Sequence, residues 1–217
     1  PSSPPTSPLT SKDNAKTMSS TRVSGDPLGE SDLLVALQKQ LADKPGVLAT
    51  ARGMSHFGEH ALGWMGTAAL GYGLATIQKK PADGPERRGW LTMGVSAFIA
   101  HAASVVLKRI VRRPRPHDPR IKIGVGTPSK LSFPSSHATS STAALVAFAQ
   151  SANNRTGALP LVGIPAMALS RMVLGVHYPS DVALGSCIGA ATAIAVRRVV
   201  DGGRGGVTKK NSEEKSQ

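Results

Sequence analysis

The sequence predicts an all-α integral membrane bundle of about five spanning helices, with an active site at one membrane face. Five apolar segments with few internal charges follow one another between residues 58 and 196. Glycine is frequent, with 23 residues, and aromatic residues make up only 4% of the chain. Small residues let membrane helices approach closely, so this composition suits a membrane bundle. The mean hydropathy is −0.08 because polar ends dilute the apolar segments.

Both ends of the chain differ in composition from its middle. Residues 1–28 are rich in Pro, Ser and Thr without apolar periodicity, and we expect a disordered tail that cannot offset its ordering entropy. Met18 lies inside it and is a candidate for the first residue of the native protein. Residues 201–217 are polar and contain several glycines, and we expect a second disordered tail. The membrane domain is therefore expected to occupy residues 58–200.

Residues 29–57 are expected to form an amphipathic membrane-surface helix followed by a linker. The helix would run from Ser31, its expected N-cap, to Asp43, before Lys44-Pro45-Gly46. Its apolar face is expected to contain Leu33, Leu34, Leu37 and Leu41. The segment is too short and too polar to cross a bilayer, so it should lie at the membrane surface or against the bundle.

The expected spanning helices vary in length. They are Gly58–Gln78, Trp90–Leu107, Ala138–Ala152, Ala158–Leu174 and Val182–Val196. The first two approach the length of about 20 residues needed to span, whereas each of the last three could be a buried helix if it stood alone. Because the five segments together contain few charges, we interpret them as membrane-spanning helices and not as buried helices of a soluble protein. Gly185-x3-Gly189 predicts a close-packing face on the fifth helix.

Counting five crossings places the polar loops on opposite faces. The loops 108–134 and 175–180 share one face with the N-terminus, and the loop 79–88 lies on the other face with the C-terminus. Basic residues occur on both faces, so the positive-inside rule does not decide the orientation. The net charge of +13 suits anionic lipids and phosphorylated substrates. Nucleic acid is not an expected partner, because the basic residues punctuate apolar runs and no nucleic-acid-binding motif is present.

The first motif supplies cations for a phosphate group. Lys108-x6-Arg115-Pro116 follows the second apolar segment, and Arg171 follows later in the chain. Arginine can bind phosphate oxygens in bidentate geometry. We interpret Arg109, Arg112 and Arg113 instead as a stop-transfer cluster at the helix end.

The second motif, Pro134-Ser135-Ser136-His137, marks the start of the third helix. Free backbone N–H groups at a helix start bind anions, so the N–H groups of Ser135 and Ser136 and one hydroxyl could hold phosphate oxygens. His137 would lie in the first helical turn and face the same site. As a general acid for the leaving oxygen, it could contribute on the order of 10²–10⁴-fold.

The third motif is Ser170-Arg171-x5-His177-x3-Asp181. Asp181 could accept a hydrogen bond from one ring nitrogen of His177 and fix its tautomer, which leaves the other nitrogen free to attack phosphorus and form a phosphohistidine. Four specified residues match by chance roughly once in 10⁵ positions, at roughly 1 in 20 per residue. No His/Asp/Glu cluster has metal-ligand spacing, so neither a metal nor another cofactor is expected.

These three motifs resemble the signature motifs of the type-2 phosphatidic acid phosphatase superfamily, whose relatives include vanadium haloperoxidases. The resemblance covers about residues 58–196. It implies that the phosphate is bound by Lys108, Arg115, Ser135, Ser136 and Arg171, and that His177 is the nucleophile, Asp181 its partner and His137 the acid. The family usually has Gly at the position of Ser136, and its common architecture has six helices where we expect five.

A narrower resemblance rests on the run 51–60, ARGMSHFGEH, together with the motif variants. This run is similar to that of actinobacterial members of the family, which remove the 5-phosphate from a decaprenyl-linked ribose in cell-wall arabinan precursor synthesis. The resemblance implies a polyprenyl-linked lipid phosphate as substrate and membrane lipids as surroundings. It also implies a membrane prenyl-phosphate phosphoribosyltransferase as the partner that hands over substrate, and a cytoplasmic active face. His56, Glu59 and His60 could contact the substrate, but such residues at a helix entry are more often interfacial and merely hydrogen-bonded, so we leave them outside the predicted site.

Three other functions stay open. A phosphatase for undecaprenyl diphosphate or phosphatidylglycerol phosphate would carry the same motifs. A haloperoxidase is disfavoured because membrane spans suit lipid substrates. A non-catalytic lipid-binding scaffold would be expected to lack the nucleophile, but His177 is present.

Overall fold

The computed structural model describes residue 26, residues 28–151 and residues 158–214, with side chains described as far as residue 202. Most of the predicted N-terminal tail, including Met18, lies outside these residues. The helices are α2 (Ser31–Leu41), α3 (Val47–Phe57), η1 (Glu59–Ala61), α4 (Leu62–Ile77), α5 (Pro85–Val111), α6 (Ser136–Ser151), η2 (Leu159–Val162), α7 (Gly163–Val173) and α8 (Pro179–Glu214). The described part of the chain contains no strand, only an isolated bridge between Pro114 and Leu131. The all-α prediction is confirmed.

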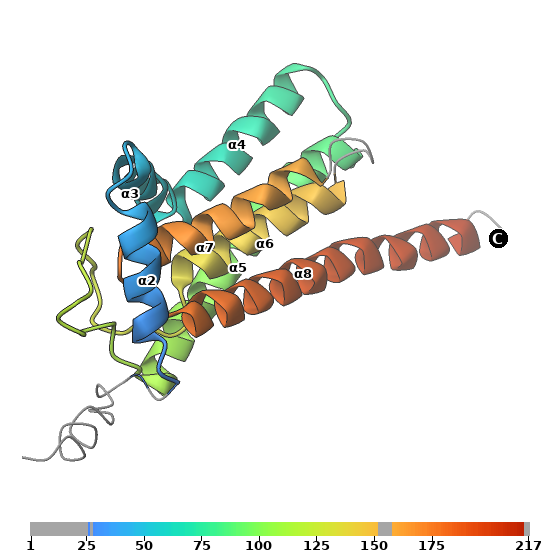
Figure 1. Cartoon of the computed structure of the whole chain (residues 1–217). Helices are drawn as coiled ribbons and strands as arrows, with labels where there is room; N and C mark the ends of the chain where they lie inside the picture. The colour runs from blue at the N-terminus through green and yellow to red at the C-terminus, as the bar shows by residue number, and fades with distance from the viewer. Residues whose placement is uncertain (1–25, 27, 152–157, 215–217) are drawn as a thin grey trace, which may run out of the picture.

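Helix α6 lies at the centre of the bundle and packs against α5, α7 and α8 (Figure 1). Helix α4 packs on α5 and diverges from the other helices toward the turn that joins the two. The short helices α2 and α3 gather at the opposite end, beside the long loop 112–135 (Figure 1). The predicted convergence of the motif-bearing loops at the N-terminal face is therefore confirmed.

The close contact between α8 and α6 depends on the two glycines of the predicted packing face. A Cβ atom on Gly189 would lie 2.2 Å from the carbonyl oxygen of Thr139, and one on Gly185 would lie 3.0 Å from that of Ser135. Any larger side chain at Gly189 would have to displace helix backbone, which is costly in a packed interior. The predicted close-packing role of Gly185-x3-Gly189 is confirmed.

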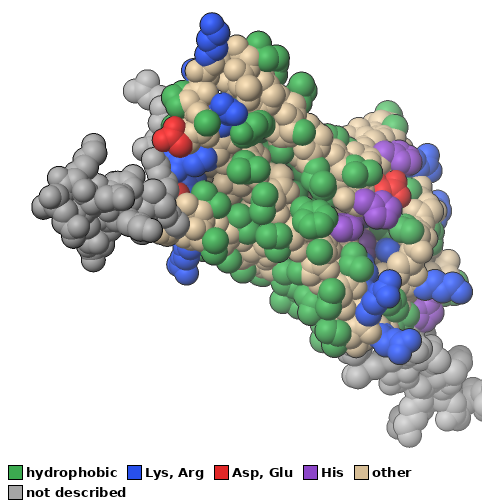
Figure 2. Space-filling view, turned by 180° about the vertical axis from the view of Figure 1, so that it is seen from behind, with side chains coloured by type: hydrophobic (Ala, Val, Ile, Leu, Met, Phe, Trp, Pro, Cys, Tyr) green, Lys and Arg blue, Asp and Glu red, His purple; other side chains and the backbone are tan. Residues whose placement is uncertain are grey.

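Two helices, Pro85–Val111 of α5 and Pro179–Gly202 of α8, are long and apolar enough to cross a membrane by length and composition. The other helices that correspond to predicted spans are shorter than α5 and α8: α4 and α6 have 16 residues each and α7 has 11. Figure 2 shows hydrophobic side chains across the middle of one face, with charged side chains gathered toward its two ends. That distribution is typical of a protein whose middle faces lipid.

The N-terminal helix differs from its prediction in its cap and in its buried face. Asp26, not Ser31, caps α2, since its carboxylate accepts hydrogen bonds from the backbone N–H groups of Glu30 at 2.7 Å and Ser31 at 2.8 Å. The buried residues are Ser31, Leu34, Val35 and Gln38. Leu33 is instead 58% exposed. Gln38 reaches the bundle, because its amide donates to the carbonyls of Lys122 at 2.7 Å and Val173 at 2.9 Å.

Two segments expected to lack regular structure are helical. Residues 47–57, interpreted from the sequence as a linker, form α3, which packs against α7. Only Ala51 and Ser55 are buried, and one of them is polar, so the face that α3 packs into the bundle is not a continuous apolar stripe of the kind that periodicity detects. At the other end, α8 continues to Glu214, through most of the segment 201–217 where the sequence predicts a tail.

Candidate active site

The three motifs meet around a cavity of about 470 Å³ at the end of the bundle where α2 and α3 lie. Six of the eight predicted site residues line it: Lys108, Arg115, Ser136, His137, Arg171 and His177. Ser135 and Asp181 are fully buried behind the wall. The prediction that residues from α5, α6 and the α7–α8 loop converge is confirmed by this placement.

His177 lies in the short connection between α7 and α8 and is 1% exposed. Its Nε2 lies 3.2 Å from Nη1 of Arg115. A guanidinium only donates hydrogen bonds, so Nε2 must accept and the proton belongs on Nδ1. Burial, together with the charges of Arg115 and Arg171, holds the pKa of His177 well below its usual value. The side chain is therefore a neutral imidazole with a lone pair at the cavity.

Asp181 stands behind His177 in the first turn of α8. Its Oδ2 lies 3.6 Å from Nδ1 of His177, longer than a hydrogen bond but close enough for the carboxylate to stabilise an imidazolium. The carboxylate also accepts from the backbone N–H of Tyr178 at 2.9 Å and from Arg113 at 3.0 Å. The side chain is fixed from two sides before any substrate arrives.

Arg113 is a residue that the sequence interpretation misplaced. It is not part of a solvated stop-transfer cluster, because its side chain is 12% exposed and bridges Asp181 to Glu30, which it contacts at 2.7 Å. Its guanidinium also lies over the ring of Tyr178, 4.1 Å from the centroid. One local signal could have shown that Arg113 belongs to the site. Prolines alternate with arginines in Arg113-Pro114-Arg115-Pro116, and they stiffen the chain around both arginines.

The two cations of the first motif are held by backbone carbonyls. Nζ of Lys108 donates to Pro134 at 2.6 Å and to Ser132 at 2.9 Å. Arg115 donates to Ser129 at 2.7 Å and to Val176 at 2.8 Å. Burial lowers the pKa of Arg115 to about 10, against the opposing charge of Asp181, so it remains cationic at neutral pH. The positive charge at the cavity is thus preorganised.

Arg171 and His137 are joined through Ser55 of α3. Nη1 of Arg171 donates to the hydroxyl of Ser55 at 2.7 Å, and Nε2 of His137 donates to the Ser55 carbonyl at 2.9 Å. Nε of Arg171 has no hydrogen-bond partner among the described residues, which leaves a buried donor for an anion. Ser55 was not among the predicted site residues, although it lies in the run 51–60, because its role depends on α3, a helix that was not predicted.

The two serines of the second motif have different roles. The backbone N–H of Ser135 donates to the carbonyl of Asp181 at 3.0 Å. The expectation that this N–H would bind phosphate is therefore wrong for this conformation: it ties α6 to α8. Ser136, at the start of α6, lines the cavity, and its hydroxyl oxygen accepts from Ser104 at 2.8 Å. Ser136 is the serine available to an oxyanion.

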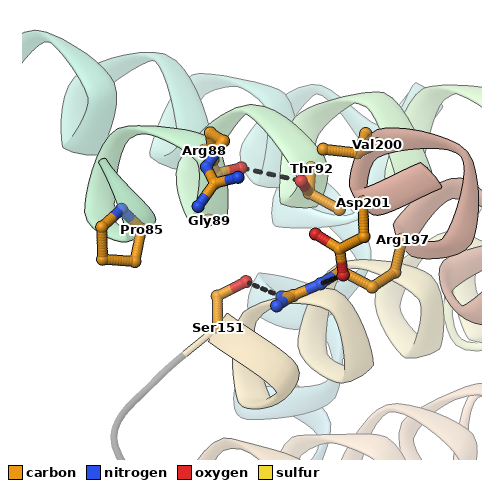
Figure 3. A pocket seen from close by; sticks show the side chains of 8 residues that line it. All are labelled: Pro85, Arg88, Gly89, Thr92, Ser151, Arg197, Val200 and Asp201. Atoms are coloured by element: carbon orange, nitrogen blue, oxygen red, sulfur yellow. Dashed lines mark hydrogen bonds and ion pairs between the residues drawn. The ribbon is translucent and has the colours of Figure 1, made fainter. Parts of the chain in front are cut away.

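A second, much smaller cavity lies at the opposite end of the bundle (Figure 3). It has a volume of about 30 Å³, close to that of a single water molecule. Arg197 pairs there with Asp201 at 2.6 Å and donates to Ser151 at 3.1 Å (Figure 3). This cavity has neither the size nor the nucleophile of the first.

Comparisons with known proteins agree with this geometry. Residues 89–203 match the PAP2 superfamily. Over 179 residues the chain is 52% identical to decaprenylphosphoryl-5-phosphoribose phosphatase of Mycobacterium tuberculosis, covering 82% of this chain and 94% of the relative. The protein of the same name in Mycolicibacterium smegmatis is 56% identical over 164 residues, covering 75% and 84%.

Two solved structures share the fold. Aquifex aeolicus LpxE has a TM-score of 0.60 and 16% identity, and the match covers 77% of this chain and 93% of that chain. The transmembrane PAP2 type phosphatidylglycerolphosphate phosphatase from Bacillus subtilis has a TM-score of 0.60 and 20% identity, covering 78% and 85%.

Proposed function

The chain belongs to the PAP2 superfamily of phosphatases, and from that premise we propose that it is a metal-independent lipid phosphatase that works through a phosphohistidine. The observation that carries this proposal is the neutral Nε2 of His177 beside Arg115, in a cavity that three further cationic side chains line, namely Lys108, Arg109 and Arg171. Buried arginine and lysine side chains can supply the charge stabilisation that other phosphatases obtain from metal ions.

The proposed reaction has two steps. Nε2 of His177 attacks phosphorus, and the bond between phosphorus and the leaving oxygen breaks while His137 donates a proton to that oxygen. Asp181 stabilises the positive charge that forms on the imidazole. In the second step His137, now deprotonated, takes a proton from water as the water oxygen attacks phosphorus. The bond between phosphorus and Nε2 of His177 breaks, which releases inorganic phosphate and restores both side chains to their starting protonation states.

The phosphate oxygens would be bound by the cationic side of the cavity. Arg115 and Arg171 offer guanidinium donors, and Ser136 adds a hydroxyl at the start of α6. Lys108 acts as a fixed charge, because its ammonium group is already bound to carbonyls of the 131–134 segment. Ser135 supports the site indirectly through its link to Asp181.

We propose decaprenylphosphoryl-5-phosphoribose as the substrate and decaprenylphosphoryl-ribose as the product. The support is the identity of 52% and 56% to two relatives that carry the name of that activity, extending over most of both chains. On this proposal the chain crosses the membrane several times with its cavity at the cytoplasmic face, where a phosphoribosyltransferase could deliver the substrate.

The test is phosphate release by detergent-purified protein in the presence of a chelator. The substrates are the decaprenyl-linked 5-phosphoribose, undecaprenyl diphosphate and phosphatidylglycerol phosphate. We expect release from the ribose lipid, and a loss of roughly 10⁴-fold or more in the His177→Ala variant, since removal of a nucleophile abolishes the covalent route. Undiminished release by this variant would rule out the phosphohistidine. Preference for another lipid would keep the mechanism and change the substrate.

A further inference from the structure

The active-site cavity has a second wall that the phosphate chemistry does not use. It is formed by four residues from α3, η1 and α5, namely His56, Glu59, His60 and His101. The rings of His60 and His101 lie 5.8 Å apart, and Nδ1 of His101 is buried without a hydrogen-bond partner among the described residues. Figure 2 shows histidine side chains around an acidic side chain at one end of the surface. We call these four residues the rim.

The rim lies on the side from which the leaving group must depart. His137, the proposed acid, is bound to the carbonyl of Ser55, one residue before His56. A Cβ atom on Gly58, one residue before Glu59, would lie 2.8 Å from Cδ2 of His137, so the chain leading into η1 packs on the ring of the acid. An acid must be within hydrogen-bond reach of the leaving oxygen. The group attached to that oxygen is therefore next to the rim.

Glu59 is the only carboxylate among the described residues that line the cavity. Its side chain is 47% exposed, and its ion pair with His60 is long, at 4.0 Å, so its oxygens retain free acceptor positions. A second phosphate placed here would be repelled by this charge. A hydroxyl group would instead donate to the carboxylate, and such hydrogen bonds to charged acceptors are strong. The imidazoles of His60 and His101 can both donate and accept, as a polyol requires.

The rim is held by an unusual backbone. His60 has a φ of +51° and Ala61 a φ of +61°, so two consecutive non-glycine residues are left-handed between α3 and α4. Such conformations are costly for residues with a Cβ and are retained mostly at functional positions. The turn ends α3 and places Glu59 and His60 at the cavity instead of along a continuous helix.

We propose that the rim is the subsite for a hydroxyl-bearing leaving group, such as the furanose ring of a sugar phosphate. The carboxylate of Glu59 selects for vicinal hydroxyls by accepting their hydrogen bonds. Its negative charge selects against a second phosphate by repulsion. This inference rests on the proposed function and adds to it the residues that distinguish a phosphorylated sugar lipid from a lipid diphosphate.

The experiment measures kcat and KM for phosphate release from three lipids. These are decaprenylphosphoryl-5-phosphoribose, its 2,3-dideoxyribose analogue and decaprenyl diphosphate. The enzymes are the wild type, Glu59→Gln and the control Glu86→Gln. Glu86 is similarly exposed, at 54%, but lies at the opposite end of the bundle in a surface pair with Lys80. Melting temperatures in detergent accompany each variant.

We expect the wild type to prefer the ribose lipid to its dideoxy analogue by about tenfold or more in kcat/KM, the range set by hydrogen bonds to a charged acceptor. Glu59→Gln should lose most of this preference, mainly through KM, and should hydrolyse the diphosphate faster than the wild type does. A rise in one activity cannot come from a merely structural defect. Glu86→Gln should behave like the wild type.

The outcomes separate the two proposals. If the wild type releases phosphate but Glu59→Gln keeps the same preference among the three lipids, the subsite is overturned and the phosphatase proposal stands. If the wild type releases no phosphate from any lipid, the proposed function fails and the subsite fails with it.

Discussion

The two ends of the bundle carry similar charged residues but use them differently. At the far end, Lys80 and Glu86 form a pair whose side chains are 42% and 54% exposed, and Arg197 is 35% exposed beside Asp201. At the active end, Arg113 and Glu30 are 12% and 10% exposed, and Arg171 is 1% exposed. Solvated pairs contribute little to stability, whereas a buried charge must be paired or must serve a ligand. Burial, and not the number of charges, therefore distinguishes the site.

The largest difference between the two ends should come from changing one arginine at each end to lysine. Arg171→Lys removes the planar guanidinium that contacts Ser55 and the cavity, and we expect kcat/KM to fall by roughly 10²–10³-fold, as when a preorganised donor is lost. Arg197→Lys, at the far end, should change it by less than about twofold. Steady-state phosphate release by both variants checks this comparison. Equal losses would mean that the far end also takes part in catalysis.

A smaller effect is expected from breaking one ion pair at each end. Glu30→Gln leaves Arg113 buried with one partner fewer, and we expect a loss of about 3 kcal/mol in the free energy of unfolding. Glu86→Gln, which breaks the exposed pair with Lys80, should cost about 0–1 kcal/mol. Unfolding in detergent with increasing denaturant measures both.

Glu30→Gln should also lower kcat, because Arg113 positions the carboxylate of Asp181 behind the nucleophile. Glu30 does not line the cavity, so KM should change little. A rise in KM with unchanged kcat would show that this pair does not act through Asp181.

The smallest effect concerns pH. Because burial and the cations Arg115 and Arg171 lower the pKa of His177, its imidazole stays neutral below pH 6.5, and the acid limb of kcat/KM should lie below that value. As the pH falls through the lowered pKa, Nε2 gains a proton and can no longer attack. Arg115→Gln removes one cation, so the pKa should rise and the limb should move to higher pH by about one unit.

The far end again provides the control for this shift. Arg197→Gln should leave the position of the acid limb unchanged, since Arg197 lines the small cavity at the other end of the bundle. If the acid limb of kcat/KM lies at the same pH in Arg115→Gln as in the wild type, a group other than His177 governs that limb.

The sequence by itself determined the main apolar helices, their order and the end of the bundle at which the motifs meet, but not α3 or the extension of α8 beyond residue 200. Apolar runs separated by polar loops specify helices, and because successive helices in a bundle run in opposite directions, the number of helices between two loops specifies whether they lie at the same end. The spacing of His177 and Asp181 spans the start of α8, so local geometry alone brings the carboxylate behind the ring. The same holds for the glycines at 185 and 189, whose spacing places both on the face toward α6.

Only the tertiary structure decided which other residues join these motifs. Arg113 and Arg112 are adjacent and chemically identical, yet Arg112 ends α5 on the exposed side while Arg113 is buried against Asp181. Ser55 and Glu59 reach the cavity because α3 packs on α7 and ends in a left-handed turn. Such contacts depend on the packing of segments that are distant in sequence. Local pattern cannot encode them, because propensity and periodicity describe a segment and not its neighbours.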